Sequence, residues 1–439
     1  MYHLNKPFLL TVDRLVSMLI TFFMTAFLYN KFGPVIVGKY ALAFSFFSIF
    51  SFLLTLGLGG VSVNYFSRFS SLNTISKIYS NMISTQFTLG FIVIVVITLI
   101  YKLNPFDAFI FECLLILTVQ FTIRRVEMLN SYFVIINKYI YLLICNTFSK
   151  FISAVFILMA YFLGFREGVL LPGYLFVESI FLFSLYVFFG NKHSVNFRCS
   201  FLSFRLAKSF LIRSWPLALS SLVVTSYMQI DQIMLGFISS TTELAFYNTA
   251  SRLIIPIGLF GSVFGMIIFP VIRKLRHKKK RNALILYHTY SAASLRIIAI
   301  SVCFFFILLG DELILLLFGA AFENAYSSLC VLALSLLFIL PSSVPAKQLI
   351  IDGLFKFELI KTSVALLINV FLNFILIPDF GSVGAAVASI CAYAISDFFM
   401  YVLLEKTRWY FHAQCMSWFL MFNIKAVACF SYKILFNKK

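Results

Sequence analysis

The sequence from Ser214 to Pro270 reads SWPLALSSLVVTSYMQIDQIMLGFISSTTELAFYNTASRLIIPIGLFGSVFGMIIFP. Two long apolar spans in it flank a short polar turn, residues 239–243. About twenty apolar residues at ~1.5 Å per residue match the ~30 Å hydrocarbon core of a bilayer. The stretch therefore predicts a transmembrane helical hairpin.

Two charged residues interrupt this hairpin, Asp231 in its first span and Arg252 in its second. Each lies about seven residues from the turn side of its span, so we expect them at the same depth in the membrane. Charge inside a membrane is costly and faces a partner or a water-filled cavity. Two interpretations stay open: a static ion pair, or Asp231 as a coupling or gating group that binds a proton or a sodium ion.

The composition of the whole chain agrees with a membrane protein. Hydrophobic residues make up 62% of the 439 residues and charged residues 12%, which excludes an ordinary soluble domain. The net charge of +19 comes from bases in short gaps between apolar runs. This pattern indicates membrane topology and contact with anionic lipids, and no nucleic acid.

Enzyme and metal motifs are missing from the sequence. The eight cysteines form no CxxC motif and no cluster with histidine, so we expect no disulfide and no metal site. GxxxxGK[ST], HExxH and GxSxG are also absent. We therefore expect a protein that is not an enzyme and needs no cofactor.

Apolar runs along the chain predict twelve membrane spans in two sets of six. They are 9–29, 37–60, 82–101, 108–133, 140–163 and 168–190, then 216–238, 246–271, 284–310, 326–350, 359–377 and 383–404. An even number of spans in each half makes the two halves parallel repeats, a plan found in transporters. The predicted fold is an all-α polytopic membrane protein with two six-helix bundles around a central cavity.

The same pattern divides the chain into four parts. We expect an N-terminal bundle at 1–190, a cytoplasmic linker at 191–213, a C-terminal bundle at 214–404 and a cytoplasmic or interfacial tail at 405–439. Lys and Arg gather in the gaps after even-numbered spans, as in the run from Arg273 to Arg281. By the positive-inside rule both termini are cytoplasmic.

Several motifs resemble the polysaccharide-transporter branch of the multidrug, oligosaccharidyl-lipid and polysaccharide exporter superfamily. They are the Asp231 hairpin with Tyr247 and Arg252, Leu56-Gly57-Leu58-Gly59-Gly60 with Tyr65, and Asn373 to Pro378 with Gly381-Ser382-Val383-Gly384-Ala385-Ala386. The resemblance is strongest to O-antigen flippases of Gram-negative inner membranes. It implies a flippase that moves undecaprenyl-diphosphate-linked oligosaccharide from the cytoplasmic to the periplasmic leaflet by alternating access. It also implies proton or sodium coupling, and an O-antigen polymerase and chain-length regulator as partners.

A diphosphate cargo needs fixed cations along its path through the membrane. The candidates within spans are Arg14, Lys150, Arg252 and Arg296. For Lys150 and Arg296 the alternative is an internal ion pair, and for Arg14 it is pairing with Asp13 or contact with lipid head groups. Arg124 and Arg125 lie in the fourth span, where Glu127 offers Arg124 a local partner.

Three other functions stay open. An ion-coupled drug/cation antiporter of the same superfamily would favour a cavity rich in acids, whereas this chain has prominent cations within its spans. A lipid II flippase is closer, although its relatives carry extra spans. A membrane O-antigen polymerase would be expected to carry a large periplasmic loop, whereas the longest such gap here is 311–325.

Overall fold

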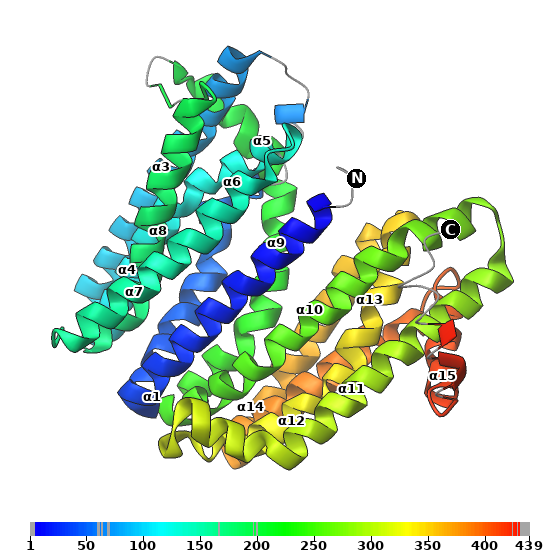
Figure 1. The fold of residues 1–439 in the computed structure, drawn as a ribbon. Helices are drawn as coiled ribbons and strands as arrows, with labels where there is room; N and C mark the ends of the chain where they lie inside the picture. The colour runs from blue at the N-terminus through cyan, green and yellow to red at the C-terminus, as the bar shows by residue number, and fades with distance from the viewer. Residues whose placement is uncertain are drawn as a thin grey trace. The chain divides into compact units, whose positions relative to one another are not determined.

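The structure is a computed structural model that describes residues 5–58, 62, 65–67, 71–165, 167–195, 197–198, 201–423, 425–427 and 429–430. The described residues form helices and no strand. They divide into two compact units, Met1–Thr225 and Ser226–Lys439 (Figure 1). Gly59 and Gly60 of the quoted motif, and the tail from 431 onward, lie outside the described residues.

The first unit is a bundle of long helices and shorter helical segments. They are α1 (Asn5–Thr55), α3 (Leu72–Leu103), α4 (Ala108–Arg124), η1 (Arg125–Met128), α5 (Leu129–Ile135), α6 (Tyr139–Leu143), η2 (Ile144–Phe148), α7 (Ser149–Phe162), α8 (Glu167–Lys192) and the first part of α9 (Phe204–Ile238). Within it α4 packs against α8, α1 and α3, and α7 packs against α8.

The second unit begins inside α9 and is also helical throughout its described residues. It contains α10 (Thr241–His277), α11 (Arg281–Phe318), η4 (Ala320–Phe322), α12 (Ala325–Leu334), α13 (Leu336–Ile351), α14 (Phe355–Asp397), η5 (Phe399–Val402) and α15 (Arg408–Leu420). Here α10 packs against α12 and α13, and α11 packs against α13 and α15.

The helices account for the twelve predicted spans. Nine helical stretches among the described residues are long and apolar enough to cross a membrane. Two of them are double: α1 is kinked at Gly33 and α14 at Gly381, which separates spans 1 and 2, and 11 and 12. The fourth span is α4, η1 and α5 in sequence. The all-α polytopic fold is confirmed, and the chain is a multi-pass membrane protein.

Helices extend further than the predicted spans do. The third predicted span begins at 82 and the seventh at 216, but α3 begins at Leu72 and α9 at Phe204. Hydropathy detects only the part of a helix that suits hydrocarbon, whereas backbone hydrogen bonding continues into polar sequence. Part of the expected linker 191–213 is therefore helical.

The kink in α14 depends on a glycine. Gly381 has a φ of 53° and a ψ of −128°, which side-chain-bearing residues rarely adopt. A Cβ there would lie 2.6 Å from Glu243 Oε2. The Glu243 carboxylate in turn accepts a hydrogen bond of 2.8 Å from the Ser382 amide, at the start of the helix after the kink. A negative group suits a helix N-terminus, so Glu243 of α10 holds this corner in place.

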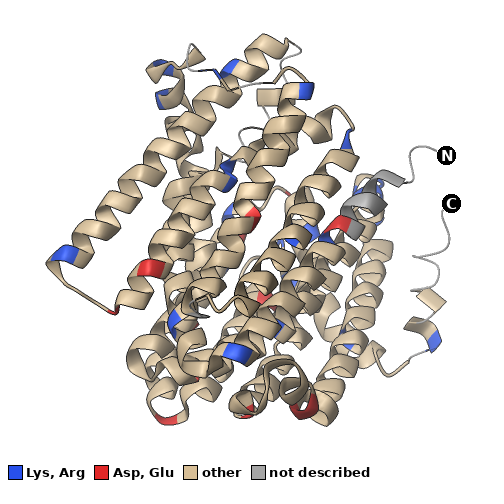
Figure 2. Ribbon diagram, turned by 60° about the vertical axis from the view of Figure 1, so that its left-hand side comes forward, with Lys and Arg blue, Asp and Glu red and all other residues tan. Residues whose placement is uncertain are grey.

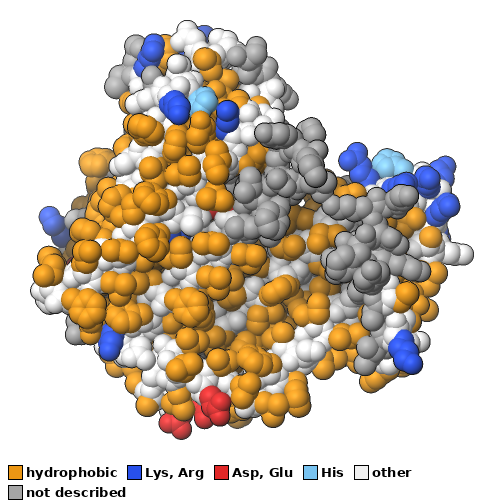
Figure 3. Space-filling model, in the orientation of Figure 1, with side chains coloured by type: hydrophobic (Ala, Val, Ile, Leu, Met, Phe, Trp, Pro, Cys, Tyr) orange, Lys and Arg blue, Asp and Glu red, His pale blue; other side chains and the backbone are white. Residues whose placement is uncertain are grey.

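The sides of both units are apolar. Large side chains such as Phe91, Phe162 and Phe371 are exposed, and Figure 3 shows hydrophobic side chains over most of the visible surface. Charged residues are sparse among the others and lie both at helix ends and along the helices (Figure 2). Apolar surface on this scale fits contact with lipid rather than water.

An ion pair joins α1 to the start of α4 in the first unit. Lys39 Nζ lies 2.6 Å from Asp107 Oδ2, and Asp107 also accepts hydrogen bonds from the Phe109 and Ile110 amides at the start of α4. Partial burial would raise the pKa of Asp107, but the hydrogen bond from Lys39, helped by the two amides, holds that pKa below its ordinary value. Asp107 thus caps α4 and ties it to α1.

Candidate functional site

Asp231 is the centre of a buried polar cluster in the second unit. Its side chain is 6% exposed. The carboxylate accepts hydrogen bonds of 2.8 Å from the Tyr247 hydroxyl, 2.6 Å from the Ser389 hydroxyl and 2.6 Å from the Asn373 amide. These partners come from α10 and from both halves of α14. Asp231 therefore joins three elements of the unit through neutral groups.

Arg252 is not the partner of Asp231 in the described part of the chain, so the static ion pair, one of the two interpretations of the sequence, is not formed there. Its Nε donates a hydrogen bond of 3.0 Å to Asn248 Oδ1, and Asn248 donates one of 2.6 Å to Gln232. Tyr247 and Arg252 are five residues apart on α10, which turns them about 140° away from each other around the helix. Arg252 also lies deeper than expected, 11 residues after the start of α10, whereas Asp231 lies 7 residues before the end of α9 and is level with Tyr247.

One acceptor atom in the Asp231 cluster has no donor among the described residues. It is the buried Asn373 Oδ1, whereas Asn373 Nδ2 also donates a hydrogen bond of 3.1 Å to Asn369 Oδ1. Buried polar atoms normally have partners, so an unsatisfied oxygen beside a carboxylate calls for an explanation. Carboxylate, amide and hydroxyl oxygens are the ligands that hard cations take, and a carboxylate can also bind a proton.

The first unit contains a second polar cluster, between α1 and the η2–α7 segment. Asp13 accepts hydrogen bonds of 3.1 Å from Asn146 and 2.8 Å from Thr147. Lys150 donates a hydrogen bond of 3.4 Å to the Ser17 carbonyl. Within the described ranges, Lys150 has no acidic partner. The internal ion pair considered for Lys150 is therefore not formed there.

Arg14 follows Asp13 on α1 but points elsewhere. Its side chain is exposed, and Asp13 is held by Asn146 and Thr147 of η2 instead. Adjacent residues on a helix do not face each other, which explains why the local pair does not form. Arg14 is thus a cation on an otherwise apolar helix surface.

Arg124 is fully engaged by acids. It contacts Glu127 one turn away and lies 2.9 Å from Glu178 of α8, whose side chain is 1% exposed. Arg125 instead stacks on the Phe121 ring at 3.7 Å. The network ties α4 and η1 to α8, so it stabilises the packing of this unit.

Arg296 of α11 is held by the tail helix. It is 1% exposed, and its two terminal amino groups donate hydrogen bonds of 2.7 and 2.6 Å to the Gln414 carbonyl and side-chain oxygens. The Trp418 ring lies 4.5 Å from the guanidinium, which no acid contacts among the described residues. A cation buried this way cannot reach a cargo unless α15 moves.

The tail therefore lies along α11. Tyr410 stacks with His288, Gln414 binds Arg296 further along α11, and Phe430 comes back to Tyr290. Among the described residues, α15 therefore packs along α11, and Phe430 lies near the first part of α11.

Sequence reasoning missed a buried ion pair within α14. Lys361 is 3% exposed and lies 2.9 Å from Asp397, while Glu358 contributes a second contact at 3.3 Å. Lys361 and Asp397 lie at similar distances on either side of the Gly381 kink. The same depth comparison that we applied to Asp231 would have paired these two.

Residues 4–276, more than half of the chain, match the family described as "Polysaccharide biosynthesis protein". The chain belongs to this family. The membership agrees with the resemblance seen in the sequence motifs.

Two relatives of this chain have names that refer to glycan biosynthesis. The probable low-salt glycan biosynthesis flippase Agl15 of Haloferax volcanii is 25% identical over 194 residues, 44% of this chain and 41% of its own. The capsular polysaccharide biosynthesis protein CapF of Staphylococcus aureus is 27% identical over 182 residues, 41% of this chain and 45% of its own. The alignments thus span less than half of each relative.

A solved transporter shares the fold over nearly the full length. The lipid II flippase MurJ in an inward closed conformation aligns with a TM-score of 0.67 and 18% identity, covering 98% of this chain and 95% of its own. At 18% identity this likeness shows the fold of the present chain and nothing about its function.

Proposed function

We propose that this protein is a flippase that moves undecaprenyl-diphosphate-linked oligosaccharide, an O-antigen unit or a related repeat, across the bacterial inner membrane. The direction is from the cytoplasmic to the periplasmic leaflet, by alternating access. Membership of the polysaccharide biosynthesis family supports the glycan cargo, and the glycan names of Agl15 and CapF agree with it. A glycan attached to a membrane lipid suits a chain made almost entirely of membrane helices.

One observation carries the proposal furthest: Arg14 and Lys150 are cations on membrane helices without an acid partner in the described part of the chain. Arg124 and Lys361 are neutralised by acids, and Arg296 is covered by Gln414 of α15. Unpaired cations in spans are costly, and a passing diphosphate is a partner that would offset that cost. A drug/cation antiporter would have no use for them.

Asp231 is the proposed coupling residue. Its carboxylate sits beside the unsatisfied Asn373 Oδ1 and two hydroxyl groups. A sodium ion would use these oxygens as ligands, and a proton would neutralise the carboxylate. Either event changes how the two halves of α14 are tied to α9 and α10. This is the kind of local change that biases an alternating-access equilibrium.

Loss of the gene tests the function in cells. In a strain without the protein, lipid-linked repeat units should accumulate in the cytoplasmic leaflet and surface polysaccharide should disappear, while synthesis of the units continues. Restoration by the intact gene supports a flippase. If the deletion strain made short surface chains normally and lacked only long ones, a polymerase would be the better assignment.

A further inference from the structure

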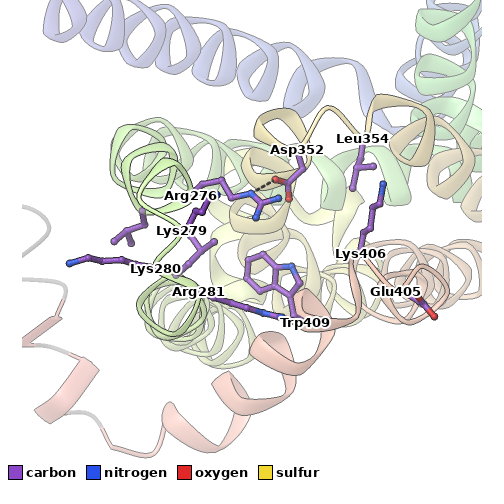
Figure 4. Close-up of a pocket in the computed structure, with 11 residues that line it drawn as sticks. Arg276, Lys279, Lys280, Arg281, Asp352, Leu354, Glu405, Lys406 and Trp409 are labelled. Carbon is purple, nitrogen blue, oxygen red and sulfur yellow. Dashed lines mark hydrogen bonds and ion pairs between the residues drawn. The ribbon is translucent and has the colours of Figure 1, made fainter.

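A pocket lies at one end of the second unit, away from the Asp231 cluster. Its volume is about 570 Å³, within the range of small-molecule sites. Three segments line it: the α10–α11 turn, the α13–α14 turn and the residues that lead into α15 (Figure 4). The lining residues that matter here are Arg276, Arg281, Asp352, Lys406 and Trp409.

Arg276 is held in position in this pocket. Its Nε donates a hydrogen bond of 2.8 Å to Asp352 Oδ1. Asp352 Oδ2 accepts two more, of 3.0 Å from Gln348 and 2.6 Å from Tyr410. Asp352 is thus committed to the protein, whereas the two terminal amino groups of Arg276 have no partner in the described residues. A guanidinium anchored through Nε and open at its fork is suited to an oxyanion.

Further cations surround Arg276 without acid partners among the described residues: Lys279, Lys280, Arg281 and Lys406. In Figure 4, Arg281 extends toward the Trp409 ring, whereas Lys280 and Glu405 point away from the pocket centre. The only other acid of the lining is Asp352, which is already bound. Lys279 adopts a φ of 53°, a left-handed conformation that glycine usually takes at a helix end. Because Asp352 is already bound and Glu405 points away, no acid of the lining neutralises the positive charge inside this pocket.

Other features of the pocket indicate a lipid as the source of the anion. Leu275, Leu284 and Leu354 add apolar lining, and the Trp409 indole lies among the charges. The pocket is at the ends of α10 and α11, both membrane-spanning by composition. Tryptophan and basic residues together are typical of the level of lipid head groups, and basic pockets between membrane helices bind phosphate-bearing head groups.

We propose that this pocket binds the phosphate of an anionic phospholipid head group, and that binding fixes the tail on the unit. Tyr410 and Trp409 connect the pocket to α15, so an occupant would hold the start of α15 against Asp352. The site is separate from the cargo and coupling residues proposed above. Its test is a binding measurement and does not depend on transport.

The chain offers its own reporter. Its three tryptophans are Trp215, Trp409 and Trp418, so a Trp215→Phe, Trp418→Phe variant leaves only Trp409 to fluoresce. The purified full-length variant in a neutral detergent is titrated with phosphatidylglycerol, phosphatidylcholine, inorganic phosphate or diphosphate. We expect saturable change in Trp409 emission with phosphatidylglycerol, little with phosphatidylcholine and weaker binding of the two soluble anions.

A pair of matched variants decides whether the pocket is the site. Arg281→Gln with Lys406→Gln removes two pocket cations and leaves the Arg276–Asp352 pair intact, and should weaken phosphatidylglycerol binding about tenfold or more. Lys274→Gln with Lys278→Gln removes the same charge from the end of α10 outside this pocket and should leave binding nearly unchanged.

Three results would overturn the proposal. Equal weakening in both double variants would mean general attraction to a basic surface. Diphosphate that binds as tightly as phosphatidylglycerol would mean a site for a soluble anion or for the cargo's own head group. Absence of any response in the intact pocket would mean that no such site exists.

Discussion

Asp231 of α9 and Tyr247 of α10 are joined by a hydrogen bond of 2.8 Å, and this contact takes the place of an ion pair with Arg252. The consequence is measurable. Because Asp231 and Arg252 do not neutralise each other, Arg252→Gln should not rescue Asp231→Asn. We expect Asp231→Asn to keep normal membrane levels, since an amide can still bond Tyr247 and Ser389, and to lose ion-dependent transport.

The measurement compares the amount of surface polysaccharide and the amount of protein in the membrane among Asp231→Asn, Arg252→Gln and the double variant. Recovery of polysaccharide in the Asp231→Asn, Arg252→Gln variant would show a static bridge and would contradict the assignment of Asp231 to coupling.

Lys150 should be required for transport and not for folding. It has only a long hydrogen bond to the Ser17 carbonyl, so Lys150→Ala removes little packing. We expect this variant to reach the membrane and to abolish surface polysaccharide, while Lys150→Arg retains part of the activity because it keeps the charge. Normal polysaccharide in Lys150→Ala cells would remove Lys150 from the cargo path.

Arg296 should behave in the opposite way. Gln414→Ala removes the side-chain acceptor of one guanidinium hydrogen bond and keeps the backbone acceptor, which should cost about 1–3 kcal/mol and lower the midpoint of thermal unfolding in detergent. The double variant Arg296→Met, Gln414→Met removes both polar groups and should recover most of that stability. A Gln414→Ala protein as stable as the wild type would show that α15 does not depend on this contact.

The predicted topology can be checked at two turns. A reporter fused at Lys279, between α10 and α11, should be cytoplasmic, and one at Glu323, between η4 and α12, should be periplasmic. The basic run of the first turn and the acids near the second supply the asymmetry. Activity of an alkaline phosphatase fused at Lys279 would place this turn in the periplasm and contradict the predicted orientation.

The fold was predictable because the length of each apolar run matches the thickness of a membrane. Twelve apolar runs located the spans, and the structure shows that α1 and α14 each join two of them across a glycine kink. Helix ends were not predictable in this way, since α3 and α9 continue into polar sequence where hydropathy carries no signal.

The site was predictable in residue type but not in partner. Depth along a helix follows from counting residues from its end, and the count for Arg252 was wrong because α10 begins at Thr241, before the predicted span at 246. The rotation of each helix about its axis depends on all its neighbours, which one sequence does not reveal. For the same reason Arg296 looked like a cargo residue, because nothing in its own span predicts that Gln414, 118 residues later, covers it.

The central claim is that the protein itself moves a lipid-linked glycan across the membrane. The direct measurement uses purified protein in vesicles that contain a polyprenyl-diphosphate-linked oligosaccharide in both leaflets and an externally added glycosidase. With the intact protein, the account predicts that the enzyme digests both pools, because inner-leaflet lipid is carried outward. Lys150→Ala vesicles should lose only the outer pool. Digestion confined to the outer pool with the intact protein, under every imposed sodium and proton gradient, would contradict the account.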